Sequence, residues 1–116
     1  METLRKLTVK EENLIAFLIQ KENLNINSDW KNKVLAFSMN DGNMGSLKLC
    51  PDGRYDEEKE YIQSFVSEYK FKDKDDVDVV ASLFLDKEGN LYELDIWKVD
   101  FSELLSLPDL LEIKNK

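Results

Sequence analysis

Two runs of alternating apolar residues around a short glycine turn constrain the fold of this chain more than any other feature. The runs are VDVVASLFLD, residues 77–86, and LYELDIWKV, residues 91–99, and KEGN lies between them. Alternation with a period of two residues is typical of a strand with one buried face, and a short glycine-containing connection joins antiparallel neighbours. The sequence therefore predicts a β-hairpin over residues 77–99.

Burial fixes the register of this hairpin, because a slip of one residue would move every side chain to the opposite face. The expected core pairs are Leu85 with Tyr92, Leu83 with Leu94, and Ala81 with Ile96. The opposite face then pairs Phe84 with Glu93, Ser82 with Asp95, and Val80 with Trp97. The first face is entirely apolar, whereas the second combines apolar bulk with carboxylates.

A further strand is expected over residues 65–71, before the turn KDKDD. It extends the same core face when it pairs Phe71 with Val77, Tyr69 with Val79, and Phe65 with Leu83, with Ser67 as a small member of that face. The preceding residues 54–64 fit either a helix or a strand, so the pattern leaves both open there.

The amino-terminal part of the chain predicts a helix and then another hairpin. Thr8 and Glu11 have the spacing of a capping box, and the apolar stripe that follows consists of Leu14, Ile15, Phe17 and Leu18. In residues 33–50, one strand alternates Leu35, Phe37 and Met39, and the other alternates Leu47 and Leu49. Residues 40–43, NDGN, offer glycine and asparagine for positive φ angles in the turn.

The tail after residue 99 is expected to cover the core with Leu104, Leu105 and Leu107. Ser102 is a candidate N-cap there, and Pro108 limits any helix. The chain has 116 residues, which suits one core. We therefore expect a single α+β domain over residues 1–116, with one antiparallel sheet of about five strands and the N-terminal helix packed on one face.

The charge balance limits the possible partners. There are 24 acidic residues against 16 basic ones, for a net charge of −8. This charge repels nucleic acid and anionic membranes and permits a basic protein partner, although acidity also serves solubility alone. No apolar run is long enough for a signal peptide or a membrane span, so we expect a soluble cytoplasmic protein.

Two residue types that catalytic sites often use are scarce. The chain has no histidine, which excludes histidine-based triads and histidine-ligated zinc. The single cysteine, Cys50, excludes an internal disulfide and fits a buried apolar position in a reducing compartment. We expect neither a catalytic residue nor a cofactor.

The predicted binding surface lies on the mixed face of the hairpin. If solvent reaches this face, Phe84 and Trp97 form an exposed apolar patch beside Glu93 and Asp95, and such patches mark binding surfaces. Asp41 and Asp100 complete the candidate set. In the alternative, the tail or the asparagine-rich connector NLNINSDW, residues 23–30, covers Trp97, and Asp95 caps a loop.

Two other acidic sets deserve comparison with this surface. Asp41, Glu93, Asp95 and Asp100 have the oxygen ligands that Mg²⁺ prefers, as a small hydrolase would need. Residues 73–78, DKDDVD, offer an alternative acidic patch of Asp73, Asp75, Asp76 and Asp78. This stretch does not fit a calcium loop, because its sixth position is Asp78 and its twelfth is Phe84.

Two stretches, MNDGNMGSL at residues 39–47 and ELDIWKVDFSELLSLP at residues 93–108, resemble motifs of an uncharacterised bacterial family of small domains. Members of that family tend to carry MNDGGMGSL and ELDIWKVDFSPL, an RKLT-type N-terminal helix and a D-x-DG-x-x-V hairpin. This chain departs from the pattern at Asn43 and Asp76, where glycine is usual, and at Glu103, where proline is usual. The resemblance implies a fold and brings no enzymatic activity with it.

A looser similarity is to immunity proteins of bacterial toxin systems, many of which end in ELD-x-x-K-x-D-x-S-x-L. That similarity implies a small acidic α+β protein that binds and blocks a toxin domain, without catalytic residues. Our hypothesis from the sequence is therefore a non-catalytic acidic binder that occludes a basic toxin domain. The alternatives are an uncharacterised housekeeping domain and a small carboxylate- or metal-dependent hydrolase.

Overall fold

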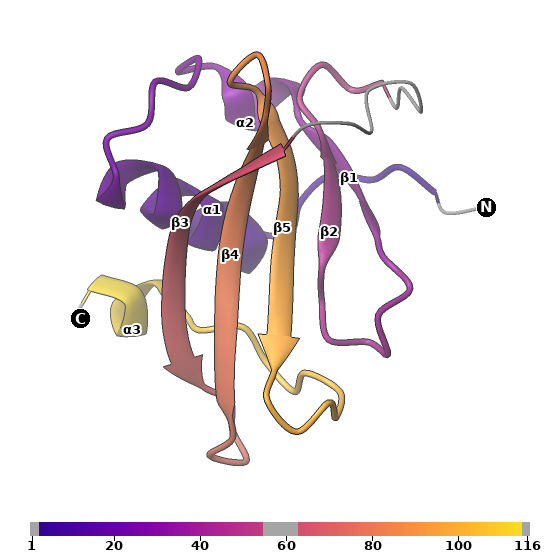
Figure 1. The fold of residues 1–116 in the computed structure, drawn as a ribbon, viewed down its shortest axis with the longest axis vertical. Coiled ribbons are helices and arrows are strands. Elements are labelled where there is room, and N and C mark those ends of the chain that lie inside the picture. The colour runs from indigo at the N-terminus through magenta and orange to yellow at the C-terminus, as the bar shows by residue number, and fades with distance from the viewer. Residues whose placement is uncertain (1–2, 55–62, 115–116) are drawn as a thin grey trace.

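The computed structural model describes residues 3–54 and 63–114 and contains one antiparallel sheet of five strands in the order β1-β2-β5-β4-β3 (Figure 1). The strands are β1 (Leu35–Ser38), β2 (Leu47–Cys50), β3 (Gln63–Lys72), β4 (Asp78–Asp86) and β5 (Leu91–Lys98). The helices are α1 (Val9–Lys21), α2 (Trp30–Lys33) and α3 (Leu110–Lys114). Helix α1 covers one face of the sheet, as expected for the α+β fold.

The core lies between α1 and the sheet. Leu14, Ile15 and Leu18 of α1 are fully buried against the apolar face of the strands. That face includes Ala36, Leu47, Leu49, Ala81, Leu83, Leu94 and Ile96. Helix α1 begins where the sequence indicates, because the Thr8 hydroxyl accepts from Glu11 N at 3.2 Å and Glu11 Oε1 accepts from Thr8 N at 2.9 Å.

The register of β4 and β5 matches the expectation over most of its length. Leu83 pairs with Leu94, Ala81 with Ile96, Phe84 with Glu93, Ser82 with Asp95, and Val80 with Trp97. The expected pair of Leu85 with Tyr92 is wrong, because Leu85 pairs with Leu91. A β-bulge between these strands leaves Tyr92 as an extra residue, and no glycine or proline marks that bulge in the sequence.

The expected register of β3 is wrong by two residues. Phe71 pairs with Val79 rather than Val77, and Tyr69 pairs with Ala81 rather than Val79. The turn is tighter than the five-residue loop that the sequence suggested, because Asp73 N donates to Val77 O at 2.9 Å. A slip of two residues keeps each side chain on its face, so Tyr69 and Phe71 are still buried in the core.

The start of β3 differs more strongly from the expectation. A second bulge lies between Phe65 and Ser67 and changes the register there. Phe65 therefore pairs with Phe84 rather than Leu83, and its side chain is 55% exposed on the face opposite α1. The ambiguous residues 55–62 lie outside the described part of the chain, and Gln63 begins β3.

The hairpin of β1 and β2 forms as expected, with positive φ angles of 75° at Gly42 and 63° at Asn43. Strand β1 already ends at Ser38, so Met39 belongs to the loop, where its N–H donates to Ser46 O at 2.9 Å. The buried residue of this strand is Ala36, whereas Leu35 and Phe37 are half-buried.

The tail runs back past the end of the sheet toward α1. Ser102 is not an N-cap, because α3 begins only at Leu110, where Asp109 Oδ1 accepts from Glu112 N at 2.9 Å. Leu104 packs against the core as expected, but Leu105 is 57% exposed. Within the described residues, no helix has the length and apolar character that a membrane crossing requires.

Candidate functional site

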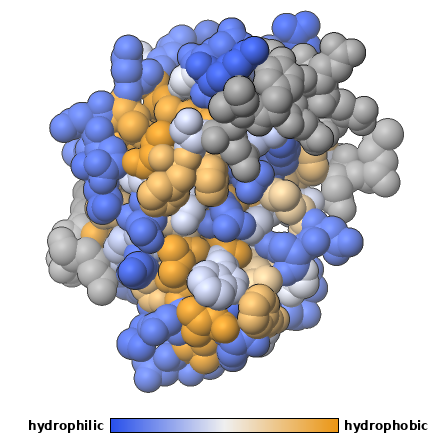
Figure 2. Space-filling model, in the orientation of Figure 1, coloured by the Kyte–Doolittle hydropathy of each residue, from blue (hydrophilic) through white to orange (hydrophobic). Residues whose placement is uncertain are grey.

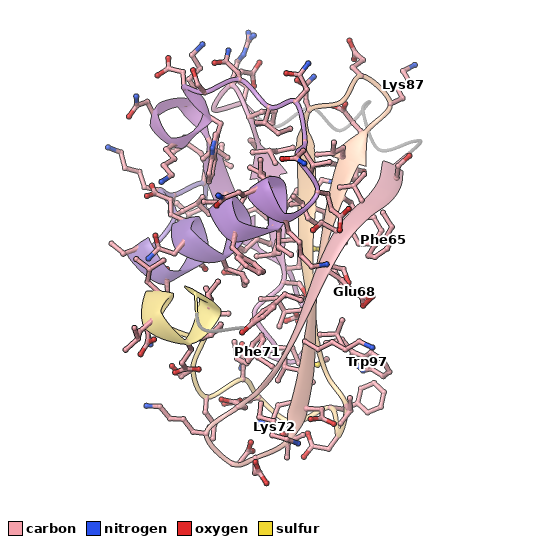
Figure 3. The ribbon with its side chains drawn as sticks, turned by 90° about the vertical axis from the view of Figure 1, so that its left-hand side faces the viewer. Phe65, Glu68, Phe71, Lys72, Lys87 and Trp97 are labelled. Carbon is pink, nitrogen blue, oxygen red and sulfur yellow. The ribbon has the colours of Figure 1, made fainter. Side chains whose placement is uncertain are left out.

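The face of the sheet opposite α1, which we call the open face, carries the candidate residues. Its side chains come from alternate positions of β3, β4 and β5: Phe65, Glu68, Lys70, Val80, Ser82, Phe84, Glu93, Asp95 and Trp97. Figure 2 shows apolar side chains gathered on this side of the molecule, and in Figure 3 Phe65 and Trp97 point away from α1. The neighbouring strands therefore bring aromatic and acidic groups onto one surface.

Two pairs of aromatic rings lie at the open face, one at each end of its apolar area. The rings of Phe65 and Phe84 meet edge to face, with centroids 6.0 Å apart. Trp97 is 45% exposed, and its ring centroid lies 6.2 Å from that of Phe101, which is 70% exposed. Phe101, in the segment after β5, covers Trp97 only in part, so this tryptophan is accessible from solvent.

Glu93 lies between the two aromatic pairs and is half-buried. Strand pairing places it between Phe84 of β4 and Lys48 of β2. Burial raises the pKa of Glu93, the nearby Asp95 carboxylate raises it further, and Lys48 opposes the change. Lys48 is itself buried and holds its ammonium 3.6 Å from the centroid of the Tyr92 ring.

Asp95 is bound to the loop between β1 and β2 through Ser46. The Ser46 hydroxyl accepts from Ile96 N at 2.8 Å and lies 3.2 Å from both Asp95 Oδ1 and Ile96 O, to one of which it donates. The Asp95 carboxylate thus has one oxygen next to Ser46. Its place across from Ser82 keeps it on the open face.

The other two predicted carboxylates stabilise loops. Asp41 accepts from Met44 N at 3.1 Å and from Ser46 N at 2.9 Å, which holds the loop after β1. Asp100 accepts from the Ser102 hydroxyl at 2.6 Å and from Ser102 N at 3.0 Å, and these hydrogen bonds lower the pKa of Asp100. Phe84, Glu93, Asp95 and Trp97 therefore lie together on one face. Asp41 and Asp100 instead accept hydrogen bonds within their own loops.

The described carboxylates do not form a cluster of metal ligands. Among residues 3–54 and 63–114, no three side chains of cysteine, aspartate or glutamate lie close enough together to hold a metal ion. On the open face, Glu93 and Asp95 lie on β5, whereas Glu68 lies on β3, with β4 between these two strands.

Lys98, which the sequence reasoning did not select, has no exposed side-chain surface and makes three polar contacts. Its ammonium lies 2.6 Å from Asp75 Oδ2, 2.9 Å from Asp73 Oδ2 and 3.0 Å from Glu103 O. Burial alone would lower the pKa of Lys98, but the hydrogen bonds to Asp75 and Asp73 outweigh it and raise this pKa. The signal in the sequence was a lysine at a core-facing position of β5, opposite Val79.

Asp73 joins the turn between β3 and β4 to the tail. Besides Lys98, it accepts hydrogen bonds from Leu105 N at 2.7 Å, Lys74 N at 2.8 Å and Ser106 N at 3.0 Å. Asp73 is buried, so it does not belong to the exposed acidic patch suggested for DKDDVD. The Asp73 carboxylate therefore stabilises the turn and the tail.

The stretches at residues 39–47 and 93–108 contact each other in the structure. Asn43 O accepts from Leu104 N at 3.1 Å, and Met44 Sδ accepts from Lys98 N at 3.4 Å. A Cβ on Gly45, where φ is 103°, would lie only 3.2 Å from Leu104 Cδ2. Both stretches thus hold the loop after β1 against the segment after β5.

Comparison with known proteins gives one finding. The model of a family described as a domain of unknown function, DUF6984, matches residues 4–108. Neither the curated proteins nor the solved structures contain a match. Because the matched residues span nearly the whole fold, from the segment before α1 to the tail, the chain belongs to the DUF6984 family.

Proposed function

We propose that this protein is a non-catalytic binder that docks a basic protein partner on its open face, in the manner of an immunity protein that occludes a toxin domain. The observation that carries this proposal is the accessible Trp97, which lies beside Phe101 on a sheet face that none of the helices in the described part of the chain covers. Exposed aromatic groups that lie close together are costly to leave in water, and they are typical of interfaces.

The open face has the two components that a protein interface uses. Trp97 and Phe84 offer large, rigid apolar groups of the kind that supply most binding free energy. Glu93, Asp95 and Glu68 offer negative charge between and beside them. Partner side chains that carry both methylene groups and positive charge, such as arginine and lysine, match this combination.

The charge of the whole chain supports a basic partner. At a net charge of −8, the protein attracts positively charged surfaces from a distance and repels acidic ones. A nuclease-type toxin has a basic cleft because its substrate is a polyanion. An acidic surface that occupies such a cleft would block the substrate without any chemistry, and the similarity of the chain end to immunity proteins favours this mechanism.

A binding experiment with matched variants tests the proposal. The protein is used to capture partners from its native host at low and high salt, and a captured basic protein is purified and titrated by calorimetry. Trp97→Ala should weaken that complex by about 2 kcal/mol, or roughly thirtyfold, as expected for an interface hot spot. Leu111→Ala is the matched control, since Leu111 is 69% exposed on α3, away from the open face.

The circular dichroism spectrum and Tm of each variant show whether it is folded. A folded Trp97→Ala protein that binds the partner as tightly as the unchanged chain would contradict the assignment of the open face. A complex that is insensitive to salt would contradict the role given to charge.

A further inference from the structure

The outer edge of β3 borders the open face, and within the described residues its outward backbone groups pair with no other strand of the sheet. Strand β3 is the last strand of the sheet and has 10 residues, and Figure 3 shows the molecule from this edge. The other edge of the sheet is partly paired, since Arg5 and Ala36 exchange two backbone hydrogen bonds of 2.8 Å. An edge of this length is a template for another strand.

The turn after β3 identifies the backbone groups at this edge. Asp73 N donates to Val77 O, and hydrogen-bonded pairs recur at every second residue of an antiparallel ladder. The N–H and C=O groups of Phe71 and Tyr69 therefore point toward β4. Those of Glu68, Lys70 and Lys72 point outward, where they need water or another chain as a partner.

We propose that a second copy of this chain pairs with the β3 edge, antiparallel and about a two-fold axis at Tyr69. In this register Glu68 of each copy lies directly opposite Lys70 of the other, so that two carboxylate–ammonium pairs form across the interface. The sheets of both copies become one continuous sheet, with helix α1 of each copy on the same side.

Charge selects this register among those that the backbone allows. An axis at Lys70 would place the two Lys70 side chains opposite each other, and an axis at Glu68 would do the same with the two Glu68 side chains. An axis at Phe71 would place Lys70 opposite Lys72. Like charges directly across a ladder are destabilising, whereas opposite charges are stabilising. Of these four axes, only the one at Tyr69 places an opposite charge across from both Glu68 and Lys70.

The bulge at the start of β3 agrees with a short contact. Val66 is the extra residue of this bulge, between Phe65 and Ser67, so regular pairing is limited to residues 67–71. The axis at Tyr69 lies at the centre of that stretch.

The test is the oligomeric state of the full chain, measured by analytical ultracentrifugation over a wide concentration range at low and high salt. The unchanged chain should form a dimer that high salt weakens. Glu68→Lys and Lys70→Glu should each weaken self-association by roughly tenfold or more, because each creates two like-charge contacts. The double variant E68K/K70E restores opposite charges and should dimerise like the unchanged chain.

Glu12→Lys and Lys6→Glu are the controls, because they make the same charge changes away from β3. A chain that stays monomeric at every concentration in low salt would overturn the proposal. A dimer that Glu68→Lys leaves unchanged, or a double variant that does not recover, would also overturn it. Trp97→Ala should leave the dimer intact, because Trp97 lies on β5, which β4 separates from the β3 edge.

A cross-link tests the register separately. In a Cys50→Ser background, the variant E68C/K70C should form disulfide-linked dimers on mild oxidation, because directly opposite residues lie within disulfide reach. E68C alone should not, since residue 68 does not face itself in this register. Equal cross-linking of both variants, or of neither, would contradict the axis at Tyr69.

Discussion

Lys98 Nζ lies 2.9 Å from Asp73 Oδ2, and neither side chain has any exposed surface. The pair connects the end of β5 to the turn between β3 and β4, and Asp73 also holds the tail through Leu105 N. A buried charge that loses a partner is strongly destabilising, because water does not replace the lost contact. Without Asp73, Lys98 would keep its contacts with Asp75 Oδ2 and Glu103 O, but the tail would lose the acceptor of Leu105 N. The Asp73 carboxylate therefore joins three parts of the fold: the end of β5, the turn between β3 and β4, and the tail.

We expect Asp73→Asn to lower Tm by roughly 10 °C or more, because it removes the charge that faces Lys98 and disturbs two backbone hydrogen bonds of the tail. Thermal unfolding followed by circular dichroism measures the change. Asp78→Asn is the control in the same hairpin. Asp78 pairs with Lys72 at 2.8 Å, but both side chains are more than half exposed, so Tm should change by about 2 °C or less. Equal losses in both variants would contradict the special role of Asp73.

Acid should destabilise the fold through the same carboxylate. Burial alone would raise the pKa of Asp73, but its backbone donors and Lys98 outweigh burial and lower the pKa below its ordinary value of 3.8. The unfolded chain therefore binds this proton more readily, and the stabilisation is complete above pH 3.8 and is lost as the pH falls through the lower folded value. Urea midpoints should thus fall below about pH 4. The Asp73→Asn variant should have a lower urea midpoint at pH 7, and its midpoint should fall less steeply as the pH is lowered. If the midpoints of the variant and the unchanged chain fell in parallel with pH, the assignment to Asp73 would be wrong.

Glu93 should act in the opposite direction. Burial and Asp95 raise its pKa above the ordinary value of 4.5, so the folded state binds the proton more readily than the unfolded chain. Its contribution to stability is therefore greatest below pH 4.5 and is lost as the pH rises through the raised folded value. Glu93→Gln should raise Tm at pH 7 by about 2 °C and remove this part of the pH dependence. Glu12→Gln on α1 is the control, and a fall in Tm for Glu93→Gln would contradict the prediction.

The sequence predicts the fold class because hydrophobic alternation records which face of each strand is buried. The pairs of Leu83 with Leu94 and of Val80 with Trp97 follow from that rule together with the short turn KEGN between the two strands. The rule fails at Leu85 and Phe65, where bulges add a residue that alternation does not count. The two-residue error in β3 has another source, since alternation is unchanged by a slip of two and the turn length had to decide.

The candidate site is predictable only in part. Alternation places Phe84, Glu93, Asp95 and Trp97 on one face, and they lie there in the structure. It does not show that Asp41 and Asp100 accept hydrogen bonds from nearby residues of their own loops. Phe101 was missed because it lies beyond β5 with a φ of 64°, where strand periodicity no longer applies. The contact between Lys98 and Asp73 joins residues far apart in the sequence, which no local pattern records.

Asn43 and Glu103, two of the positions at which the chain departs from the motif pattern that it resembles, contact each other. Asn43 Nδ2 donates to Glu103 Oε1 at 3.1 Å across the two loops. Asn43 also has a φ of 63°, a left-handed conformation that asparagine tolerates better than residues other than glycine. Glycine, the usual residue of the pattern, would adopt this conformation without strain, so the backbone explains why both residue types occur here.

Replacement of Asn43 should therefore separate the backbone from the side chain. We expect Asn43→Ala to lower the free energy of unfolding by about 1 kcal/mol, because alanine is strained in the left-handed region. Asn43→Gly loses only the exposed hydrogen bond to Glu103, so its free energy of unfolding should lie within about 0.5 kcal/mol of the unchanged chain. Urea unfolding measures both, with Asn40→Ala as the control in the same loop. If Asn43→Ala and Asn43→Gly were equally destabilising, the contact with Glu103 rather than the backbone conformation would govern this position.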